Sequence, residues 1–307
     1  MKSNRNSQDP SSNRKGGTPF WEKMQPKKKA SFERKTDPVE RTKHRPVKHS
    51  ATSKEKGWDQ VAKWYDQLVG DEGSDYHKNI IVPAIMARLG ELSGVRVLDL
   101  CCGQGFIGKL LLQAGAARVH GVDASPQLIE SAVNRAAQEP CLSYEVADAS
   151  APGAWADGSY DVALNIMAVH DVENLDGLCH NLSNSLKPQG KALMVFMHPC
   201  FRMPKQSHWG WDQEKKIQYR RMDRYGSAMS IPIITHPGRV VSESTTFYHR
   251  PLPLYFQAMK QAGLAVTDCE ELFSHRRSQV GPRSKAEHFA AEEFPMFLLL
   301  EVQRLAK

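Results

Sequence analysis

The chain has 307 residues, 40% of them hydrophobic, so it can build the core of one large α/β domain or of two small ones. Its net charge of +7 is unevenly spread. Residues 1–56 hold 16 Lys and Arg against 6 Asp and Glu, whereas the rest of the chain holds 25 against 28. This distribution argues against a basic nucleic-acid face on the body of the protein.

The cysteines and the hydropathy pattern indicate where the protein works. Six cysteines show no CxxC pair and no Cys/His spacing typical of zinc, so the sequence predicts reduced thiols, no metal centre and a cytoplasmic location. No apolar run approaches the roughly 20 residues that a membrane-spanning helix needs. The N-terminus also lacks the apolar segment of a secretory signal.

Residues 1–56 are rich in Lys, Arg, Ser, Asn and Pro and poor in aliphatic side chains. Such a segment cannot bury enough apolar surface to offset the entropy lost on ordering, so it is predicted to be a disordered basic tail. The run of lysines at 27–29 could be a nuclear signal or a nucleic-acid arm. A solvated tail without a partner is the simpler interpretation.

From Gly57 the pattern changes to one of ordered elements. Apolar residues between Trp58 and Val69 recur at three- and four-residue spacing, which is typical of an amphipathic helix. Further helices are expected over 76–89, 105–114, 126–137, 174–186 and 252–262, and strands over 96–100, 117–123, 142–148, 160–167, 190–198, 266–273 and 294–305. This alternation predicts a mostly parallel sheet with helices on both faces, in one domain over 57–307.

The stretch from Val97 to Gly105 reads VLDLCCGQG, a buried strand with an acid near its end and then two glycines that open a helix. Glycines let the backbone approach a ligand closely at the carboxyl edge of a parallel sheet. The helix N-terminus behind them favours a carboxylate or another anion. With Gly108 the segment also satisfies GxGxxG, so a dinucleotide-binding domain is the alternative.

Three acids at successive strand ends distinguish the two cofactors. Asp123 lies 20 residues after Gly103 and could bind ribose hydroxyls in either case. Asp99, just before the glycines, suits a positively charged group and is unfavourable beside a pyrophosphate. Asp148 is placed to accept a hydrogen bond from an adenine amino group. Together they favour S-adenosylmethionine over NAD.

These motifs resemble those of the class I, Rossmann-like S-adenosylmethionine-dependent methyltransferases over roughly residues 95–198. The matching segments are the first motif Val97–Gly105, the ribose loop Val119–Asp123, the adenine loop Ala147-Asp148, the fourth-strand motif Tyr160–Asn165 and the turn Leu186–Lys191. The chain departs from the family's pattern at Cys101-Cys102, where many members have Gly-Cys or Gly-Thr. It departs again at Gln189, the first glycine position of the family's LKPGG turn.

The resemblance implies a fold and a set of cofactor contacts. The fold is a seven-stranded, mostly parallel sheet with an antiparallel last strand, helices on both faces and a helical cover formed by residues 57–90. The expected cofactor-binding residues are Asp99, Cys101, Gly103 and Gly105 around the methionine part, Asp123 with Ala124 at the ribose, Asp148 and Ala149 at the adenine, and Asn165 and Ile166 beside the sulfonium.

The acceptor must reach the sulfonium methyl from segments that follow or cover the strand ends. His170 follows the fourth strand, His198 follows the fifth, and Tyr65 lies on the first helix. We take these three as candidate catalytic residues, although His170 could merely satisfy a loop and Tyr65 could belong to the core. The methyl is already electrophilic, so alignment and exclusion of water are the main tasks and no metal need follow.

Residues 199–250 exceed the usual length of a strand–helix connection. Their aromatic side chains and the basic cluster of Arg220, Arg221 and Arg224 predict a cap insertion that walls the acceptor pocket. A surface excursion with a small core of its own is the alternative.

Segments near His198 and Tyr248, together with the first two helices, resemble small-molecule methyltransferases of the ubiquinone/menaquinone group. The resemblance implies methyl transfer to a small-molecule acceptor whose identity and reacting atom the sequence does not give. Two alternatives stay open: an RNA or protein methyltransferase guided by the basic tail, and a non-catalytic S-adenosylmethionine-binding module. The oligomeric state is not indicated.

Overall fold

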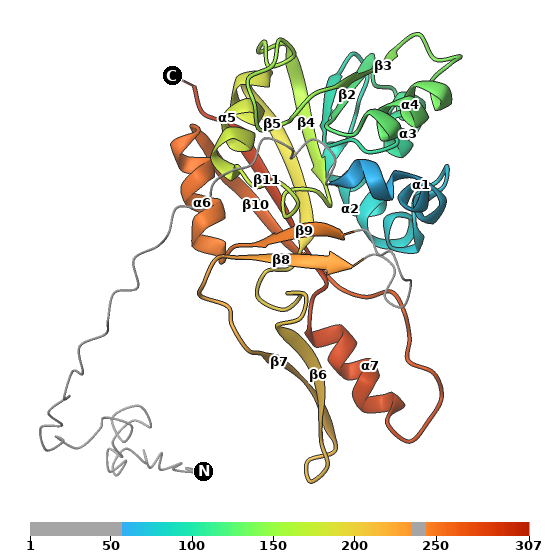
Figure 1. Cartoon of the computed structure of the whole chain (residues 1–307), viewed down its shortest axis with the longest axis vertical. Coiled ribbons are helices and arrows are strands. Elements are labelled where there is room, and N and C mark those ends of the chain that lie inside the picture. The colour runs from blue at the N-terminus through green and yellow to red at the C-terminus, as the bar shows by residue number, and fades with distance from the viewer. Residues whose placement is uncertain (1–56, 235–243, 307) are drawn as a thin grey trace, which may run out of the picture. The chain divides into compact units, whose positions relative to one another are not determined.

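The computed structural model describes residues 57–234 and 244–306 (Figure 1). The fold lies within the second of the two units into which the chain divides, Ala51–Lys307. The predicted disordered tail, residues 1–56, lies outside the described residues, and so does the 235–243 part of the expected cap.

Seven strands form one sheet in the order β10-β11-β5-β4-β1-β2-β3. Their bounds are β1 Arg96–Leu100, β2 Arg118–Asp123, β3 Leu142–Val146, β4 Tyr160–Ile166, β5 Leu186–Met197, β10 Leu264–Leu272 and β11 Phe297–Arg304. Strands β1 to β5 run parallel, and β11, the last strand of the chain, is antiparallel to both of its neighbours. The predicted Rossmann-like sheet with an antiparallel last strand is therefore confirmed.

Helices cover both faces of the sheet (Figure 1). They are α1 Trp58–Val69, a π-helical turn His77–Ile81, α2 Val82–Leu89, α3 Phe106–Gln113, α4 Pro126–Arg135, α5 Leu175–Ser185 and α6 Leu252–Gln261. Helix α7 Ser284–Glu293 packs instead against strand β7 Ile217–Met222, outside this sheet. Side chains of β1 alternate between two cores: Leu98 and Leu100 pack with residues of α5 and α6, and Val97 packs with residues of α2 and α3. The central strands β1 and β4 are buried on both faces, as a parallel sheet requires, whereas the edge strands β3 and β10 are largely exposed.

Two helices begin where polar residues can satisfy their free N–H groups. The Ser125 hydroxyl accepts a hydrogen bond from Leu128 N at 3.2 Å, and the Asn174 side chain accepts one from Gly177 N at 3.0 Å. Ser125 follows strand β2 closely, and Asn174 follows the loop after strand β4. They fix the start of α4 and α5 near the carboxyl edge.

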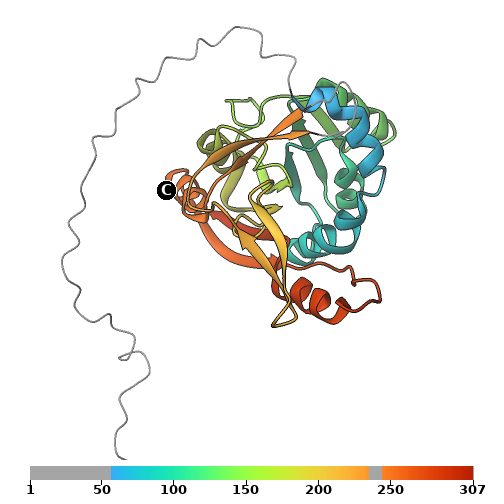
Figure 2. The same ribbon diagram turned by 60° about the horizontal axis from the view of Figure 1, so that its bottom comes forward.

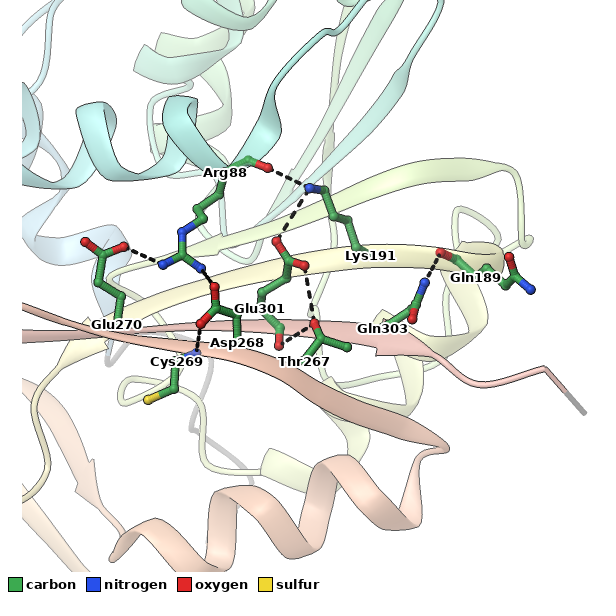
Figure 3. A network of polar contacts seen from close by, with 9 residues as sticks. All are labelled: Arg88, Gln189, Lys191, Thr267, Asp268, Cys269, Glu270, Glu301 and Gln303. Atoms are coloured by element: carbon green, nitrogen blue, oxygen red, sulfur yellow. Dashed lines mark hydrogen bonds and ion pairs between the residues drawn. The ribbon is translucent and has the colours of Figure 1, made fainter.

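A polar network holds α2 against the edge of the sheet formed by β5, β11 and β10 (Figure 3). Arg88 at the end of α2 pairs with Asp268 and, at 2.7 Å, with Glu270. Lys191 of β5 donates to the Arg88 carbonyl at 2.6 Å and lies 3.5 Å from Glu301 of β11. These partly exposed pairs fix the orientation of α2 more than they add stability.

The structure differs from the predicted elements at two places. Strand β5 begins at Leu186 rather than at residue 190, because Leu186 already pairs with Tyr160 before the register shifts and the chain rejoins β4 at Lys191. The predicted turn is thus an irregular beginning of the strand. Helix α7 is not among the predicted elements, and Ala290 is its only buried residue, so it lacks the apolar stripe that marks a helix.

The expected cap insertion consists of two hairpins. Strands β6 Ser207–Asp212 and β7 Ile217–Met222 form one, and β8 Met229–Ile234 and β9 Ser244–His249 form the other. Figure 2, with this end of the molecule turned forward, shows both hairpins in front of the sheet. The buried side chains of Met203, Ile231 and Phe247 form a small core of their own, as the alternative interpretation of the insertion expects. That the insertion walls the acceptor pocket stays a prediction.

Candidate functional site

The glycine-rich turn after β1 is tied to the end of β2. Cys102 N donates to the Val122 carbonyl at 3.0 Å, and Gly103 N donates to Asp123 Oδ2 at 2.9 Å. The other oxygen of Asp123 accepts from Ser125 N at 2.9 Å. Cys101 and Gly103 have positive φ values of 59° and 56°, which bend the backbone sharply here. The predicted residues Cys101, Gly103 and Asp123 therefore meet at the carboxyl edge.

The pattern GxGxxG has a packing explanation in this chain. A Cβ on Gly105 would lie 2.6 Å from the Tyr144 hydroxyl, and a Cβ on Gly108 would lie 2.5 Å from it. A Cβ on Gly121 would meet the same ring at 2.6 Å. Tyr144 also donates to the Gly105 carbonyl at 3.2 Å. The second and third glycines of the pattern thus make room for Tyr144 of β3, and the pattern does not require a pyrophosphate.

Asp99 is a buried carboxylate at the end of β1. Its side chain receives no hydrogen bond from any residue in the described ranges, and burial with the nearby charge of Asp123 raises its pKa to about 8. Burial also raises the pKa of Asp123, while the N–H groups of Ser125 and Gly103 oppose that shift. A cation placed beside Asp99 would restore its charged form.

Helix α1 covers the turn from above. A Cβ on Gly103 would lie 3.3 Å from the ring of Tyr65, so this ring lies directly over the glycine. Burial, followed by the charges of Asp123, Asp171 and Asp99, raises the pKa of Tyr65 well above its usual value. The phenol is therefore neutral and can donate a hydrogen bond but cannot act as a base near pH 7.

Contacts between α1 and α4 keep this cover in place. Asp59 accepts hydrogen bonds from the Ser125 hydroxyl at 2.9 Å and from Gln127 N at 3.1 Å, so it extends the cap of α4. Arg135 at the end of α4 pairs with Asp66 at 2.7 Å. The two ends of α1 are thus anchored to the helix that follows β2.

The predicted adenine residues lie after β3. Asp148 is exposed, and its Oδ1 accepts from the N–H and hydroxyl of Ser150, both at 2.8 Å. Ala149 is buried, and its carbonyl accepts from Asn181 at 2.8 Å. Ala124, next to Asp123, is exposed. An adenine amino group could therefore reach the free oxygen of Asp148 at a surface of small side chains.

Asn165 and Ile166 end β4, beside β1. Asn165 is fully buried and donates to the Leu100 carbonyl at 3.0 Å, whereas its Oδ1 has no partner within the described part of the chain. Ile166 is half-buried and packs against the second core. The hydrogen bond from Asn165 therefore fixes the distance between the ends of β1 and β4. Its Oδ1 stays available to accept a hydrogen bond from a ligand.

The loop after β4 brings His170 and Asp171 together. His170 is 5% exposed, its Nε2 lies 3.8 Å from Asp171 Oδ2, and its ring packs on Phe247 at 4.8 Å between centroids. Burial, helped by Arg250, lowers the pKa of His170 to about 3. Its Nδ1 has no partner among the described residues. His170 is thus a neutral imidazole with an unused nitrogen.

Asp171 is an acid that sequence reasoning places on the acceptor side with His170 but does not include among the three catalytic candidates. Burial and the charge of Asp123 raise its pKa well above the usual value, and its charge acts on Tyr65 and Cys101. Its position directly after His170 was the available signal. Asp171 lies in the loop after β4 and not at the end of that strand, so a search for acids at strand ends does not find it.

The cap insertion supports this loop. Tyr248 N donates to the His170 carbonyl at 2.6 Å. The buried Arg250 donates to the carbonyls of Val172 at 2.7 Å and Glu173 at 2.6 Å. The cap therefore holds the segment that carries His170 and Asp171.

His198 lies at the end of β5 with both ring nitrogens engaged. Its Nδ1 accepts from Cys200 N at 3.2 Å, and its Nε2 lies 3.0 Å from Glu271 of β10. Burial lowers its pKa, although Glu271 acts in the opposite direction. Its contacts join the ends of β5 and β10, and none of them reaches the acids around Gly103.

The cysteines within residues 57–234 and 244–306 form no disulfide. All six cysteines fall inside these ranges and are free thiols. Residues 57–234 and 244–306 hold no group of three or more His, Cys, Asp or Glu side chains suited to a metal ion. No helix in the same ranges is long and apolar enough to cross a bilayer.

Comparison with known proteins agrees with this geometry. Residues 97–190 match a family model described as a methyltransferase domain. The chain is 30% identical over 155 residues to a demethylmenaquinone methyltransferase of Tropheryma whipplei (strain Twist), a match that covers 50% of this chain and 62% of the relative. It is 32% identical over 147 residues to a 2-phytyl-1,4-naphtoquinone methyltransferase of Nostoc punctiforme, with 46% and 63% covered. The chain thus spans less than two thirds of these relatives.

A solved structure extends the likeness beyond the matched domain. An S-adenosylmethionine-dependent methyltransferase from Mesorhizobium loti is 27% identical, with a TM-score of 0.56, and the match covers 76% of this chain and 100% of that one. The fold and the matched domain are those of the class I S-adenosylmethionine-dependent methyltransferases. Within that class the chain resembles the ubiquinone/menaquinone group, and S-adenosylmethionine is the cofactor of this class.

Proposed function

We propose that this protein transfers the methyl group of S-adenosylmethionine to a small-molecule acceptor. The observation that carries the proposal is Asp99, a buried carboxylate without a hydrogen-bond donor in the described ranges, at the foot of the turn that contains Gly103. Leaving such a group unpaired is costly, and a bound cation removes the cost. The amino group of the cofactor's methionine part would supply that cation.

The residues around the turn fit the rest of the cofactor. Asp123 uses one acceptor position on each oxygen for Gly103 N and Ser125 N, and a carboxylate has about four such positions, so it can still accept from ribose hydroxyls. Asp148 and Ala149 offer an acceptor and a small surface to the adenine. The cofactor supplies a methyl on positively charged sulfur. The protein must hold it, cover it and exclude water.

On the acceptor side we assign His170 as the base. It is buried, neutral and has a free Nδ1, so it would take the proton of an acceptor hydroxyl or amine while the acceptor's lone pair bonds to the methyl carbon. The carbon–sulfur bond would break at the same time, and its electron pair would stay on sulfur as a neutral thioether. A cation bound nearby would lower the pKa of Asp171, and its carboxylate would then raise the low pKa of His170 and stabilise the resulting imidazolium. Tyr65 covers the turn and can donate a hydrogen bond. For His198, we assign a positioning role, because both its nitrogens are engaged.

Two of the relatives are named for quinone substrates, and this favours a small acceptor over a macromolecule. The six free thiols support a reducing, cytoplasmic location. The second candidate is an RNA or protein acceptor guided by the tail, and it rests on the 16 basic residues in 1–56.

The test is transfer of an isotopically labelled methyl group from S-adenosylmethionine into fractionated cell extract. We expect label in the small-molecule fraction, and much less of it with the His170→Gln variant. Label confined to RNA or protein would favour the second candidate. No label in any fraction from an enzyme that binds the cofactor would favour a non-catalytic module.

A further inference from the structure

A cavity lies away from the acids around Gly103. Its volume is about 310 Å³, and it is bounded by the β6–β7 hairpin, the segment after β10 and α7. Figure 1 shows α7 beside this hairpin, beyond the carboxyl edge of the sheet. Its charged lining is Arg202, Arg276, Arg277 and Glu287, a formal surplus of two positive charges. None of the predicted cofactor residues contributes to it.

Arg202 is the least satisfied of these charges. No carboxylate of the described residues pairs with it, and its buried Nε has no hydrogen-bond partner there. Its guanidinium lies over the ring of Trp209, 5.6 Å from the centroid. Burial lowers the pKa of Arg202, which is the response of a cation that has lost water without gaining a counter-charge.

A second arginine, Arg220, adds positive charge to the wall of the cavity that Arg202 and Trp209 form. Arg220 also lies over Trp209, at 5.0 Å, and donates to the Phe201 carbonyl and the Ser207 hydroxyl rather than to an acid. Burial and the neighbouring Arg202 lower its pKa to about 10. Two guanidinium groups therefore share one indole ring, and neither has an anionic partner in the described ranges.

The opposite wall is partly neutralised. Arg276 lies over the Tyr76 ring at 4.6 Å and pairs with Asp75 at 2.7 Å. Arg277 has no such partner among the described residues. Glu287 is the one acid of the lining and lies beyond ion-pair distance of the arginines. A ligand with a negative charge could thus bind the guanidinium of Arg202 on one wall and that of Arg277 on the other.

We infer that this cavity binds a small anion: a carboxylate or phosphate group attached to an apolar body. Aromatic rings hold the guanidinium groups in place, which lowers the entropy lost when their planar forks bind an anion. Tyr76, Trp209 and Met296 provide apolar wall for the rest of the ligand. The inference goes beyond the proposed methyl transfer, because the cavity can fill whether or not the cofactor site is occupied.

The test is calorimetric titration of the full chain, without cofactor, with phenyl phosphate, benzoate and the neutral benzyl alcohol. We expect saturable binding of at least one anion, and no comparable binding of the alcohol. The two anionic probes distinguish a phosphate site from a carboxylate site. Arg202→Gln and Arg277→Gln should each weaken binding of the preferred anion by about tenfold, the effect of one charge-assisted contact.

Arg224→Gln is the matched control, because it removes an exposed arginine from the same insertion without touching the cavity. It should change the affinity by less than about twofold, as expected for screened surface charge. Arg277 is exposed, so its variant should fold even if the Arg202 variant does not. The inference is overturned if neither anion binds, if benzyl alcohol binds equally well, or if Arg277→Gln and Arg224→Gln have the same effect.

Discussion

The ring of Tyr65 lies so close to Gly103 that a Cβ at position 103 would be 3.3 Å from it. Gly103 also has a φ of 56°, a conformation that side chains disfavour. One residue of the glycine turn is thus constrained twice, by its backbone and by the helix that covers it. The cover and the turn form one unit, although 38 positions separate the two residues in the sequence.

Replacement of Gly103 tests this relationship. Gly103→Ala should lower the free energy of unfolding by more than the roughly 1 kcal/mol expected from a positive φ alone. Gly263→Ala is the matched control, since Gly263 has a φ of 74° and nothing within 4 Å of the added Cβ. Chemical denaturation of both variants measures the difference. If both variants lose the same free energy of unfolding, the Tyr65 ring moves aside at no cost and the close contact does not constrain Gly103.

The pH dependence of Asp99 gives the second prediction. Its folded pKa of about 8 exceeds the ordinary 3.8, so the folded state keeps a proton that the unfolded state releases. Stability from the neutral acid is full below about pH 4 and is lost as the pH rises through about 8. Asp99→Asn should therefore stabilise the cofactor-free protein relative to wild type, and increasingly so toward pH 8.

Cofactor binding should respond to the same substitution in the opposite way. Because the charged carboxylate attracts the amino group, Asp99→Asn should weaken binding of S-adenosylmethionine by about tenfold or more at pH 8. Thermal unfolding from pH 5 to 9, with and without cofactor, measures both effects. A variant that loses stability at pH 8 without cofactor would contradict this account of Asp99.

The two histidines should differ when each is replaced by glutamine. His170→Gln should lower kcat by about 100-fold or more, the usual contribution of a general base, with little change in cofactor affinity. His198→Gln should lower the free energy of unfolding by about 1–2 kcal/mol, because it disturbs the contacts with Cys200 and Glu271. Steady-state kinetics and denaturation separate the two. The reverse pattern would exchange their assigned roles.

His170 also predicts the shape of the pH profile. Its pKa of about 3 keeps it neutral above pH 5, so it should produce no loss of kcat between pH 5 and 7. Stability from burying the neutral ring is present above the ordinary pKa of 6.5 and is lost as the pH falls toward 3. An acid limb near pH 6.5 that disappears in His170→Gln would show that the ring titrates normally.

Asp123 should affect the cofactor more than the fold. Asp123→Ala should weaken binding of S-adenosylmethionine by about 1.5–3 kcal/mol, the scale of hydrogen bonds to a charged group. Asp157→Ala is the control, because Asp157 accepts a hydrogen bond from the N–H two residues later, as Asp123 does, but lies in an exposed loop. Calorimetry should show unchanged affinity for the control. Similar losses in both variants would remove Asp123 from the site.

The basic tail should be dispensable for a small acceptor. Deletion of residues 1–56 should leave kcat/KM unchanged within error, since the remaining 25 Lys and Arg against 28 Asp and Glu offer no basic surplus. If the tail delivers a nucleic acid, its deletion should raise KM and added salt should mimic the deletion. Kinetics of the two chain lengths at low and high salt decide between them.

The sequence predicted those parts of the site that depend only on where consecutive strands end. Asp99, Asp123 and Asp148 each lie at or just beyond the end of a parallel strand, and such ends meet at one edge whatever the loops do. The turn at Gly103 was predictable for the same reason.

Other parts depend on contacts between distant segments. The packing of Tyr144 against Gly105 and Gly108 joins β3 to the turn, and no local pattern indicates it. Arg250 holds the loop of His170 from 77 or more positions away. The arginines of the cavity beside α7 come from the cap and from the segment before α7, and no local pattern of the sequence indicates that these two segments meet. Tertiary packing brings them together.

Calorimetric titration of the full chain with S-adenosylhomocysteine, the demethylated product, tests the central claim most directly. The account predicts one saturable site per chain, weakened by Asp123→Ala and by Asp99→Asn but not by Asp157→Ala. NADH should show no binding under the same conditions. Binding of NADH in place of S-adenosylhomocysteine, or product binding that is insensitive to both site variants, would contradict the account.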